Sequence, residues 1–129
     1  MTGRAALNAG KRWERDAAKH ATARLAAAGI IANGEQVARR ASIGKHDDEG
    51  DLFGIPDFAV QCKNTTRIDL TVVDEAEQQA SNLGASYGVL LQKRRQAGAG
   101  AAYAVMTFDT LLDIIIELNR RETDEDRLP

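Results

Sequence analysis

Cysteine and histidine are scarce in this sequence: its 129 residues include one cysteine, Cys62, and two histidines. A single cysteine excludes an internal disulfide framework and fits a reducing cytoplasm. So few thiol and imidazole groups also argue against a structural zinc site. Long apolar runs are missing, and the N-terminus lacks the pattern of a signal peptide. We therefore expect a cytoplasmic protein with no membrane partner.

Motifs of the common nucleotide-binding folds are missing as well. The sequence has no glycine fingerprint of dinucleotide-binding proteins, no Walker loop and no internal repeat. Its composition, with 43% hydrophobic and 28% charged residues, is that of an ordinary globular protein. We predict one domain over residues 1–129, with flexible ends at residues 1–6 and 121–129.

The charges are segregated along the chain. The net charge of −2 argues against a strongly basic nucleic-acid-binding protein. Residues 1–45, however, carry nine Lys or Arg against three Asp or Glu, whereas residues 46–60 carry five acids and no Lys or Arg. A basic region beside an acidic cluster is typical of a surface that binds phosphate through a metal ion. A solvated helix followed by an acidic loop explains the same charges, and charge alone favours that simpler explanation.

Residues 57–63 have the clearest strand pattern in the chain. Period-two alternation gives one face to the apolar residues Phe58, Val60 and Cys62. The opposite face ends in Gln61 and Lys63, two residues apart. The pattern predicts a strand with one face toward a core and with an amide and an ammonium group side by side on the other face.

Asp51 lies just upstream, at the end of a predicted partner strand. We expect Phe53 to pair with Asp57 across a turn over residues 54–56. This register places Asp51 diagonal to Gln61, about 7–8 Å away between backbones, which side chains can close. Asp57 itself lies about 13 Å from Gln61 along an extended strand, too far to share an ion. The hairpin therefore predicts that a carboxylate, an amide oxygen and a lysine converge.

The other patterns predict helices and strands on either side of this hairpin. Helices are expected at residues 9–28, capped by Asn8, at residues 74–83, and from a cap at Asp109. Strands are expected at residues 35–41, 68–73, 87–92 and 101–107. Trp13, Ala17, Ala21 and Leu25 could form the buried stripe of the first helix. The order predicts an α/β fold with a mixed central sheet flanked by helices. The last helix is apolar on more than one side, so we expect one face to join the core and the surplus to cover a partner subunit.

Asp51 followed by Gln61-Cys62-Lys63 resembles the active-site hairpin of the PD-(D/E)-x-K nuclease superfamily, in which an Asp is followed by Glu/Asp-x-Lys on the next strand. Gln61 stands where that family usually has an acid. The order of the predicted elements resembles the restriction-endonuclease-like core of the family. Carboxylate and carbonyl-type oxygens are the ligands that magnesium prefers, and a nearby ammonium stabilises charge on phosphate.

The resemblance implies a ligand set for Mg²⁺ or Mn²⁺ made of Asp51, the side-chain oxygen of Gln61 and the main-chain carbonyl of Cys62. Lys63 would position the attacking water and stabilise the developing charge. Residues 10–16 are similar to an N-terminal helix that supplies a glutamate to the metal site, here Glu14, directly or through water. The simpler alternative is that Glu14 pairs with a nearby Arg or Lys at the surface. Asp48 or Glu49 could supplement the oxygen ligands.

Residues 39–44 resemble the Arg- and Ser-rich stretch that precedes the catalytic Asp in Holliday junction resolvases of the archaeal type. A second basic cluster follows the predicted strand at residues 87–92. Guanidinium, ammonium and hydroxyl groups of this kind contact the phosphate backbone of DNA. The candidate DNA-binding residues are Lys11, Arg39, Arg40, Ser42, Lys45, Lys93 and Arg94. Ordinary surface charge explains these clusters equally well.

The resemblance implies a Mg²⁺-dependent endodeoxyribonuclease similar to Holliday junction resolvases, which act as homodimers in DNA recombination and repair. Compact nucleases of this pattern are frequent in bacteriophages. Two alternatives stay open. One is a nicking or restriction-type nuclease on duplex DNA, and the other is a module that has lost catalysis and only binds DNA. A small α/β protein-interaction domain without nucleic acid is the simplest remaining possibility.

Overall fold

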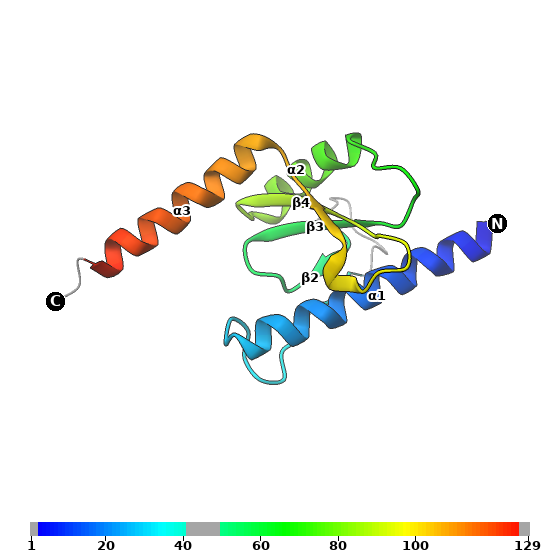
Figure 1. Cartoon of the computed structure of the whole chain (residues 1–129), viewed down its shortest axis with the longest axis horizontal. Coiled ribbons are helices and arrows are strands. Elements are labelled where there is room, and N and C mark those ends of the chain that lie inside the picture. The colour runs from blue at the N-terminus through cyan, green and yellow to red at the C-terminus, as the bar shows by residue number, and fades with distance from the viewer. Residues whose placement is uncertain (1–2, 41–49, 127–129) are drawn as a thin grey trace.

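The computed structural model describes residues 3–40 and 50–126, with residues 123–126 described by their backbone only. Along the chain the elements are α1 (Gly3–Ala27), β1 (Ala38–Arg39), β2 (Leu52–Phe53), β3 (Phe58–Lys63), α2 (Thr71–Leu83), β4 (Tyr87–Gln92), the 3-10 turn η1 (Ala99–Ala101), β5 (Tyr103–Val105) and α3 (Phe108–Asp126) (Figure 1). The strands form one sheet in the order β1-β2-β3-β4-β5. The pair β3–β4 is parallel and the other neighbouring pairs are antiparallel. The predicted mixed α/β fold is confirmed.

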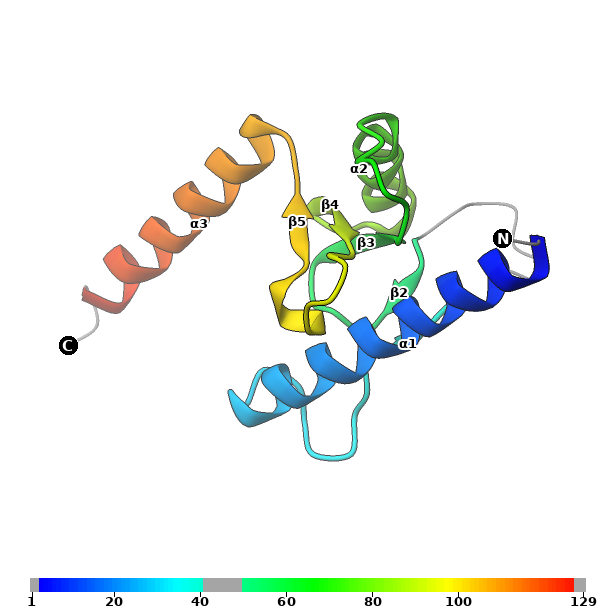
Figure 2. The same ribbon diagram turned by 45° about the vertical axis from the view of Figure 1, so that its right-hand side comes forward.

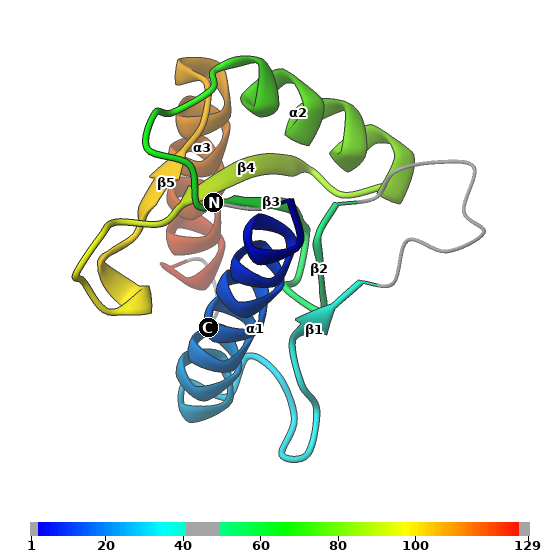
Figure 3. The ribbon, with the colours of Figure 1, turned by 90° about the vertical axis from the view of Figure 1, so that its right-hand side faces the viewer.

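The sheet is covered on its two faces by α1 and α2 (Figure 3). α1 packs Trp13 against Val60 and Cys62 of β3 in one buried apolar cluster. On the other face, Val72 of α2 packs against Leu90 of β4 in a second cluster. The alternation predicted for β3 is therefore confirmed, and the face that carries Gln61 is covered by a helix as well.

Gly88 sets how closely α2 approaches the sheet. A Cβ added at Gly88 would lie 2.6 Å from the backbone nitrogen of Glu77 and would also collide with the carbonyl group of Ala76. Real Cβ atoms essentially never approach another heavy atom within 3.0 Å. Any side chain at position 88 would push the helix away, so Gly88 fixes the height of α2 above the strands.

The register of the β2–β3 hairpin differs by two residues from the sequence prediction. Leu52 pairs with Val60, so Asp51 stands opposite Gln61 instead of diagonal to it. The reason is a longer turn: Gly54 and Asp57 both adopt left-handed backbone conformations, with φ of 103° and 65°. The shift brings the carboxylate nearer to the amide than the predicted register did.

Several predicted element bounds are wrong. The helix α1 begins at Gly3 and not after Asn8, because residues 4–7 include strong helix formers. Residues 71–73 begin α2, although their β-branched side chains favoured a strand. Asp69 explains this start, since its Oδ1 accepts hydrogen bonds from the N–H of Thr71 at 3.0 Å and from its hydroxyl at 2.6 Å. β1 and β5 are shorter than predicted, and residue 41 lies outside the described residues.

The last helix, α3, departs most from the sequence prediction. It begins at Phe108, and the residue before it, Thr107, caps this start, because the Thr107 hydroxyl accepts the N–H of Thr110 at 3.2 Å; the predicted cap Asp109 lies inside the first turn. The helix runs to Asp126, so residues 121–126 are helical, not flexible as predicted. Figures 1 and 2 agree that it extends away from the sheet beyond β5.

The prediction that one face of α3 joins the core is wrong for residues 108–122, the part of the helix with described side chains, in which Thr110 alone is buried. Six large apolar side chains of α3 are exposed: Phe108, Leu111, Leu112, Ile115, Ile116 and Leu118. A cavity of about 300 Å³ separates the helix from the body of the domain. Among the described residues, no helix has the length and apolar character needed to cross a membrane.

Candidate metal and nucleic-acid site

Asp51 stands directly before β2, beside the edge of β3. Its N–H donates to the carbonyl of Val60 at 2.7 Å. Its side-chain Oδ2 accepts the N–H of Cys62 at 2.8 Å. β2 pairs with β3 at Leu52. Next to this pair, the carboxylate of Asp51 accepts a main-chain hydrogen bond that a carbonyl of a longer partner strand would otherwise accept. The carboxylate of Asp51 is therefore held in place at the edge of β3.

Gln61 contacts the same carboxylate through its side chain. The hydrogen bonds are satisfied when Gln61 Nε2 donates to Asp51 Oδ2 at 2.5 Å and Oδ1 at 3.2 Å, while Gln61 Oε1 accepts from Gln79 Nε2. This orientation of the amide follows from its hydrogen-bond partners. Gln61 is 7% exposed and Gln79 is 3% exposed. The predicted convergence of Asp51 and Gln61 is therefore present, with the amide nitrogen facing the carboxylate.

Sequence analysis did not assign Gln79 to the site. It lies on α2 with the buried residues Val72, Ala76 and Ala80, at helical spacing. An amide on the apolar face of a helix needs a buried hydrogen-bond partner, and this was the available signal. The sequence could not identify that partner, because Gln61 is contacted only through the packing of α2 on the sheet.

Cys62 can contribute its main-chain N–H and carbonyl to the site, but not its thiol. The N–H and the carbonyl of one strand residue point to the same edge, so the carbonyl of Cys62 lies on the side of Asp51. The carbonyl of Lys63 points the other way and accepts the N–H of Lys93 at 2.9 Å. Burial raises the pKa of the Cys62 thiol far above its usual value, and the charges of Asp51 and Glu14 raise it further. The protonated thiol is not a nucleophile.

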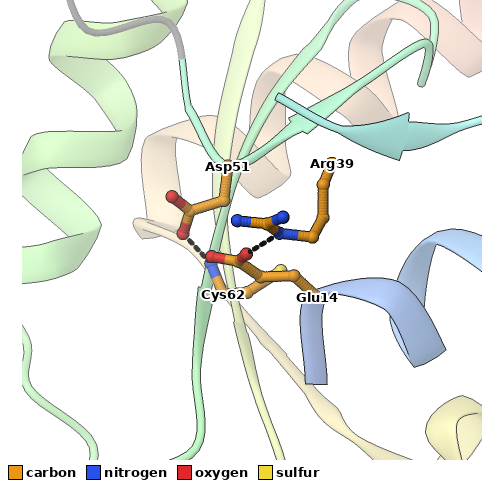
Figure 4. A network of polar contacts seen from close by, with 4 residues as sticks. All are labelled: Glu14, Arg39, Asp51 and Cys62. Carbon is orange, nitrogen blue, oxygen red and sulfur yellow. Dashed lines mark hydrogen bonds and ion pairs between the residues drawn. The ribbon is translucent and has the colours of Figure 1, made fainter. Parts of the chain in front are cut away.

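Glu14 reaches this region from α1 and is held by Arg39 of β1. Arg39 Nε donates to Glu14 Oε2 at 2.6 Å in a part-buried ion pair. Figure 4 shows this pair beside the Asp51–Cys62 hydrogen bond, and the charges of both carboxylates act on Cys62. The structure thus places Glu14 near the site together with the arginine that neutralises it. Arg39 was predicted to contact DNA, but in this structure its guanidinium is paired with Glu14.

Lys63 ends β3 and is exposed. It shares the Gln61 side of the strand, as the alternation predicted. Its charge contributes to lowering the pKa of Asp69, although hydrogen bonds from Thr71 are the larger cause. Lys63 therefore lies near the loop that leads into α2, where solvent and a substrate can reach its ammonium group.

The other predicted DNA-binding residues are dispersed. Lys11 lies half-buried on α1, and the guanidinium of Arg40 lies 5.2 Å from the ring centroid of Phe53. Lys93 and Arg94 line a cavity at the ends of β3 and β4. Ser42, Lys45, Asp48 and Glu49 lie outside the described residues.

The oxygen atoms at this edge of β3 could hold a metal ion with little negative charge from the protein. Within residues 3–40 and 50–126, no three His, Cys, Asp or Glu side chains gather in a way that could hold a metal ion. Mg²⁺ needs fewer protein ligands than this, since it is commonly held by one or two carboxylates and keeps several waters. Asp51 and the Cys62 carbonyl are oxygen donors on one edge, and the Gln61 amide presents its oxygen there after a half-turn about its last bond. These residues fit a magnesium or manganese ion that a phosphate helps to bind.

Comparison with protein-family models, with curated proteins and with solved structures gave no match.

Proposed function

We propose that this protein is a Mg²⁺- or Mn²⁺-dependent DNA endonuclease that acts selectively on branched DNA, in the manner of Holliday junction resolvases. The observation that supports it best is the contact of Asp51 with Gln61 and with the Cys62 N–H at the edge of β3. Lys63 follows on the same strand. A carboxylate, an amide and a lysine in this order can serve phosphodiester hydrolysis once the amide presents its oxygen.

The residues divide the work as follows. Asp51, the Gln61 oxygen and the Cys62 carbonyl would hold the ion, which supplies charge to polarise the scissile phosphate. Lys63 orients the attacking water and donates to the phosphate oxygens as negative charge develops on them. Gln79 determines which end of the Gln61 amide faces Asp51, because it is hydrogen-bonded to the other end. Glu14 stays paired with Arg39 unless the bound DNA draws that arginine to a phosphate, in which case Glu14 can accept a proton or a water.

A homodimer is part of the proposal. Two symmetric cuts in a junction need two active sites. The exposed apolar side chains of α3 support a self-association surface, since Phe108 is 72% exposed and Leu118 is 57% exposed. Side chains of this size are rarely clustered on the surface of a monomer without a partner. Light scattering coupled to size-exclusion chromatography measures the mass of the protein in solution. A monomer at all concentrations would disprove the proposed homodimer.

The test uses two asparagine variants from the same hairpin. Asp51→Asn removes the charge at the proposed metal site and should lower cleavage of a four-way junction in Mg²⁺ about 100-fold or more. Asp57→Asn keeps an oxygen that accepts the N–H of Ser86, the bond made at 2.9 Å in the wild type, and should cut as the wild type does. Lys63→Ala should bind the junction normally and cut poorly.

The outcome also separates the alternatives. Cleavage of linear duplex at the same rate as the junction would favour a nicking or restriction-type nuclease. A catalytically weakened DNA-binding module is favoured by one observation: the Gln61 amide satisfies Asp51 without an ion. If the wild type binds DNA but cuts neither substrate in Mg²⁺ or Mn²⁺, and Lys63→Ala binds equally well, the enzymatic proposal is wrong.

A further inference from the structure

A cavity of about 300 Å³ opens at the carboxyl ends of the parallel strands β3 and β4. Its lining comes from the segments that follow these strands and from β5: Thr65, Thr66, Ile68, Gln92, Lys93, Arg94, Arg95 and Tyr103. Ligands of open α/β sheets bind beyond the carboxyl ends of the strands. The volume is at the lower end of the range for small-molecule sites. The place and the size fit a ligand no larger than one nucleotide.

The lining is cationic and contains no acid. Lys93, Arg94 and Arg95 follow one another at the end of β4. Arg95 is held in position because its Nη2 donates to the hydroxyl of Thr66 at 3.0 Å. Among the described residues no carboxylate forms an ion pair with any of these three cations. The Thr65 hydroxyl already donates to the carbonyl of Arg67 at 2.8 Å, but the remaining N–H groups of the three cations and the hydroxyl of Thr66 are donors for a phosphate group.

One wall of the cavity is a flat aromatic surface. The guanidinium carbon of Arg94 lies 4.8 Å from the ring centroid of Tyr103. Arg94 Nη1 also contacts the carbonyl of Ala101 at 3.4 Å, which limits its movement. Tyr103 remains 51% exposed. A stacked arginine and tyrosine form the kind of platform on which a nucleobase lies, because every base has a π-face.

The floor of the cavity carries an unpaired acceptor. Gln92 is 3% exposed and its Nε2 donates to the carbonyl of Thr65 at 2.5 Å. Its Oε1 has no partner among the described residues. A buried acceptor without a donor is unfavourable, and the N–H groups of a nucleobase are donors that could satisfy it. The O–H of inorganic phosphate could also satisfy this acceptor, but phosphate has no π-face to lie against Arg94 and Tyr103, so the floor and the wall together favour a nucleotide.

We propose that this cavity binds one nucleotide whose base is unpaired, with its phosphate on Lys93 and Arg95 and its base against Arg94 and Tyr103. The inference rests on the proposed function in naming DNA as the source of that nucleotide. Gln92 is the register partner of Lys63, so the cavity adjoins the proposed catalytic lysine. A base in a duplex has both faces covered by its neighbours and cannot stack on this wall. The cavity therefore selects DNA with unpaired bases next to the cleavage position.

The test measures binding in EDTA, where cleavage does not interfere. Fluorescence anisotropy of a labelled oligo(dT) reports the unpaired strand, and a blunt duplex of equal length is the reference. Tyr103→Ala should weaken oligo(dT) binding about 5- to 100-fold and leave duplex binding nearly unchanged, whereas Tyr103→Phe should retain most of the affinity. Arg95→Ala should weaken binding and lower the dependence on salt by about one phosphate contact. Leu7→Ala and Arg120→Ala are matched controls, since these side chains are exposed on α1 and α3 and line neither the cavity nor the proposed metal site.

Each outcome decides the inference. Loss of oligo(dT) affinity in the two cavity variants with unchanged controls supports it. Equal affinity in all variants, or equal loss in the controls, overturns it. Competition by free thymidine monophosphate shows that a single nucleotide suffices, and competition by oligo(dT) alone shows that the strand is the natural source. If the wild type cuts junctions and Tyr103→Ala is neutral, the inference fails and the proposed function stands. If Tyr103 is needed for binding but the wild type cuts no DNA, the inference stands and the proposed function fails.

Discussion

Replacing Gln61 with Glu tests the contact on which the proposed site depends. In the wild type the amide donates to Asp51 at 2.5 and 3.2 Å inside the protein. Glu has the same shape but puts a second carboxylate against the first. The lost hydrogen bond to a charged group costs about 1.5–3 kcal/mol. Two charges ~4 Å apart at an effective dielectric constant of 20 repel by about 4 kcal/mol. The pair avoids part of this cost by binding a proton, so we expect about 2–4 kcal/mol of destabilisation at pH 8.

The pH dependence of this loss has a definite sign. Like-charge repulsion and burial raise the pKa of one carboxyl in the folded variant above its unfolded value of about 4.3. The folded state then binds more protons than the unfolded state. The destabilisation is therefore full above the raised pKa and disappears as the pH falls toward the unfolded value. A divalent ion relieves the same repulsion, and we expect it to bind 10- to 100-fold more tightly than to the wild type, at about 1.4 kcal/mol per factor of ten.

Thermal unfolding at pH 5 and pH 8, in EDTA and in Mn²⁺, measures both effects. For a domain of this size the variant should melt roughly 10 °C lower in EDTA at pH 8, and Mn²⁺ should recover most of the difference. Gln92→Glu is the matched control, because it places a carboxylate in an equally buried position at the end of β4. A Gln61→Glu protein whose melting temperature does not respond to Mn²⁺, or responds no more than the control does, would refute the reasoning.

Four further results are expected. Gln79→Glu in its ionised form can only accept hydrogen bonds, so it should turn the neighbouring amide until its oxygen faces Asp51 and should tighten Mn²⁺ binding, measured by calorimetry; weaker binding would contradict the assigned contact. Gly88→Ala should destabilise the protein by about 1–3 kcal/mol or more in urea unfolding, whereas Gly10→Ala, with open space at its Cβ, should stabilise it slightly; equal effects would disprove the packing of α2 described here. The thiol of Cys62, with its raised pKa, should react with an aromatic disulfide only after unfolding, and rapid reaction of the native protein at pH 8 would be inconsistent with its burial. Asp69 has a lowered pKa in the folded state, so Asp69→Asn should reduce stability at neutral pH but not once the pH falls below the folded pKa; a constant difference between pH 7 and pH 2 would argue against the cap at Thr71.

The hairpin illustrates how far sequence reasoning reached. Alternation in residues 58–63 predicted the strand and its apolar face, and the structure confirms both, since Phe58, Val60 and Cys62 pack in one cluster. The register was wrong by two residues, because Gly54 and Asp57 lengthen the turn through left-handed conformations. Turn conformation depends on hydrogen bonds such as the one from Ser86 N to Asp57, which joins segments distant in the chain. Local patterns carry no information about that bond.

The start of α2 shows a conflict between local signals. Val72 and Val73 favoured a strand by propensity, but both are buried against the sheet as part of a helix. The capping hydrogen bonds of Asp69 and the packing above Gly88 decide in favour of the helix. Whether α3 packs against the sheet was not predictable from the sequence either, since an apolar helix can be covered by its own domain or by another molecule.

By itself the sequence determined the mixed α/β class, the strand that carries Gln61 and Lys63, and the absence of a disulfide framework. These depend on periodicity and composition, which are properties of neighbouring residues. The tertiary structure alone decided that Gln79 fixes the Gln61 amide, that Arg39 holds Glu14, and that Arg94 and Tyr103 share one wall of a cavity. Each of these contacts joins residues from different elements, and the free energy that selects them comes from burial and hydrogen bonding across the whole fold.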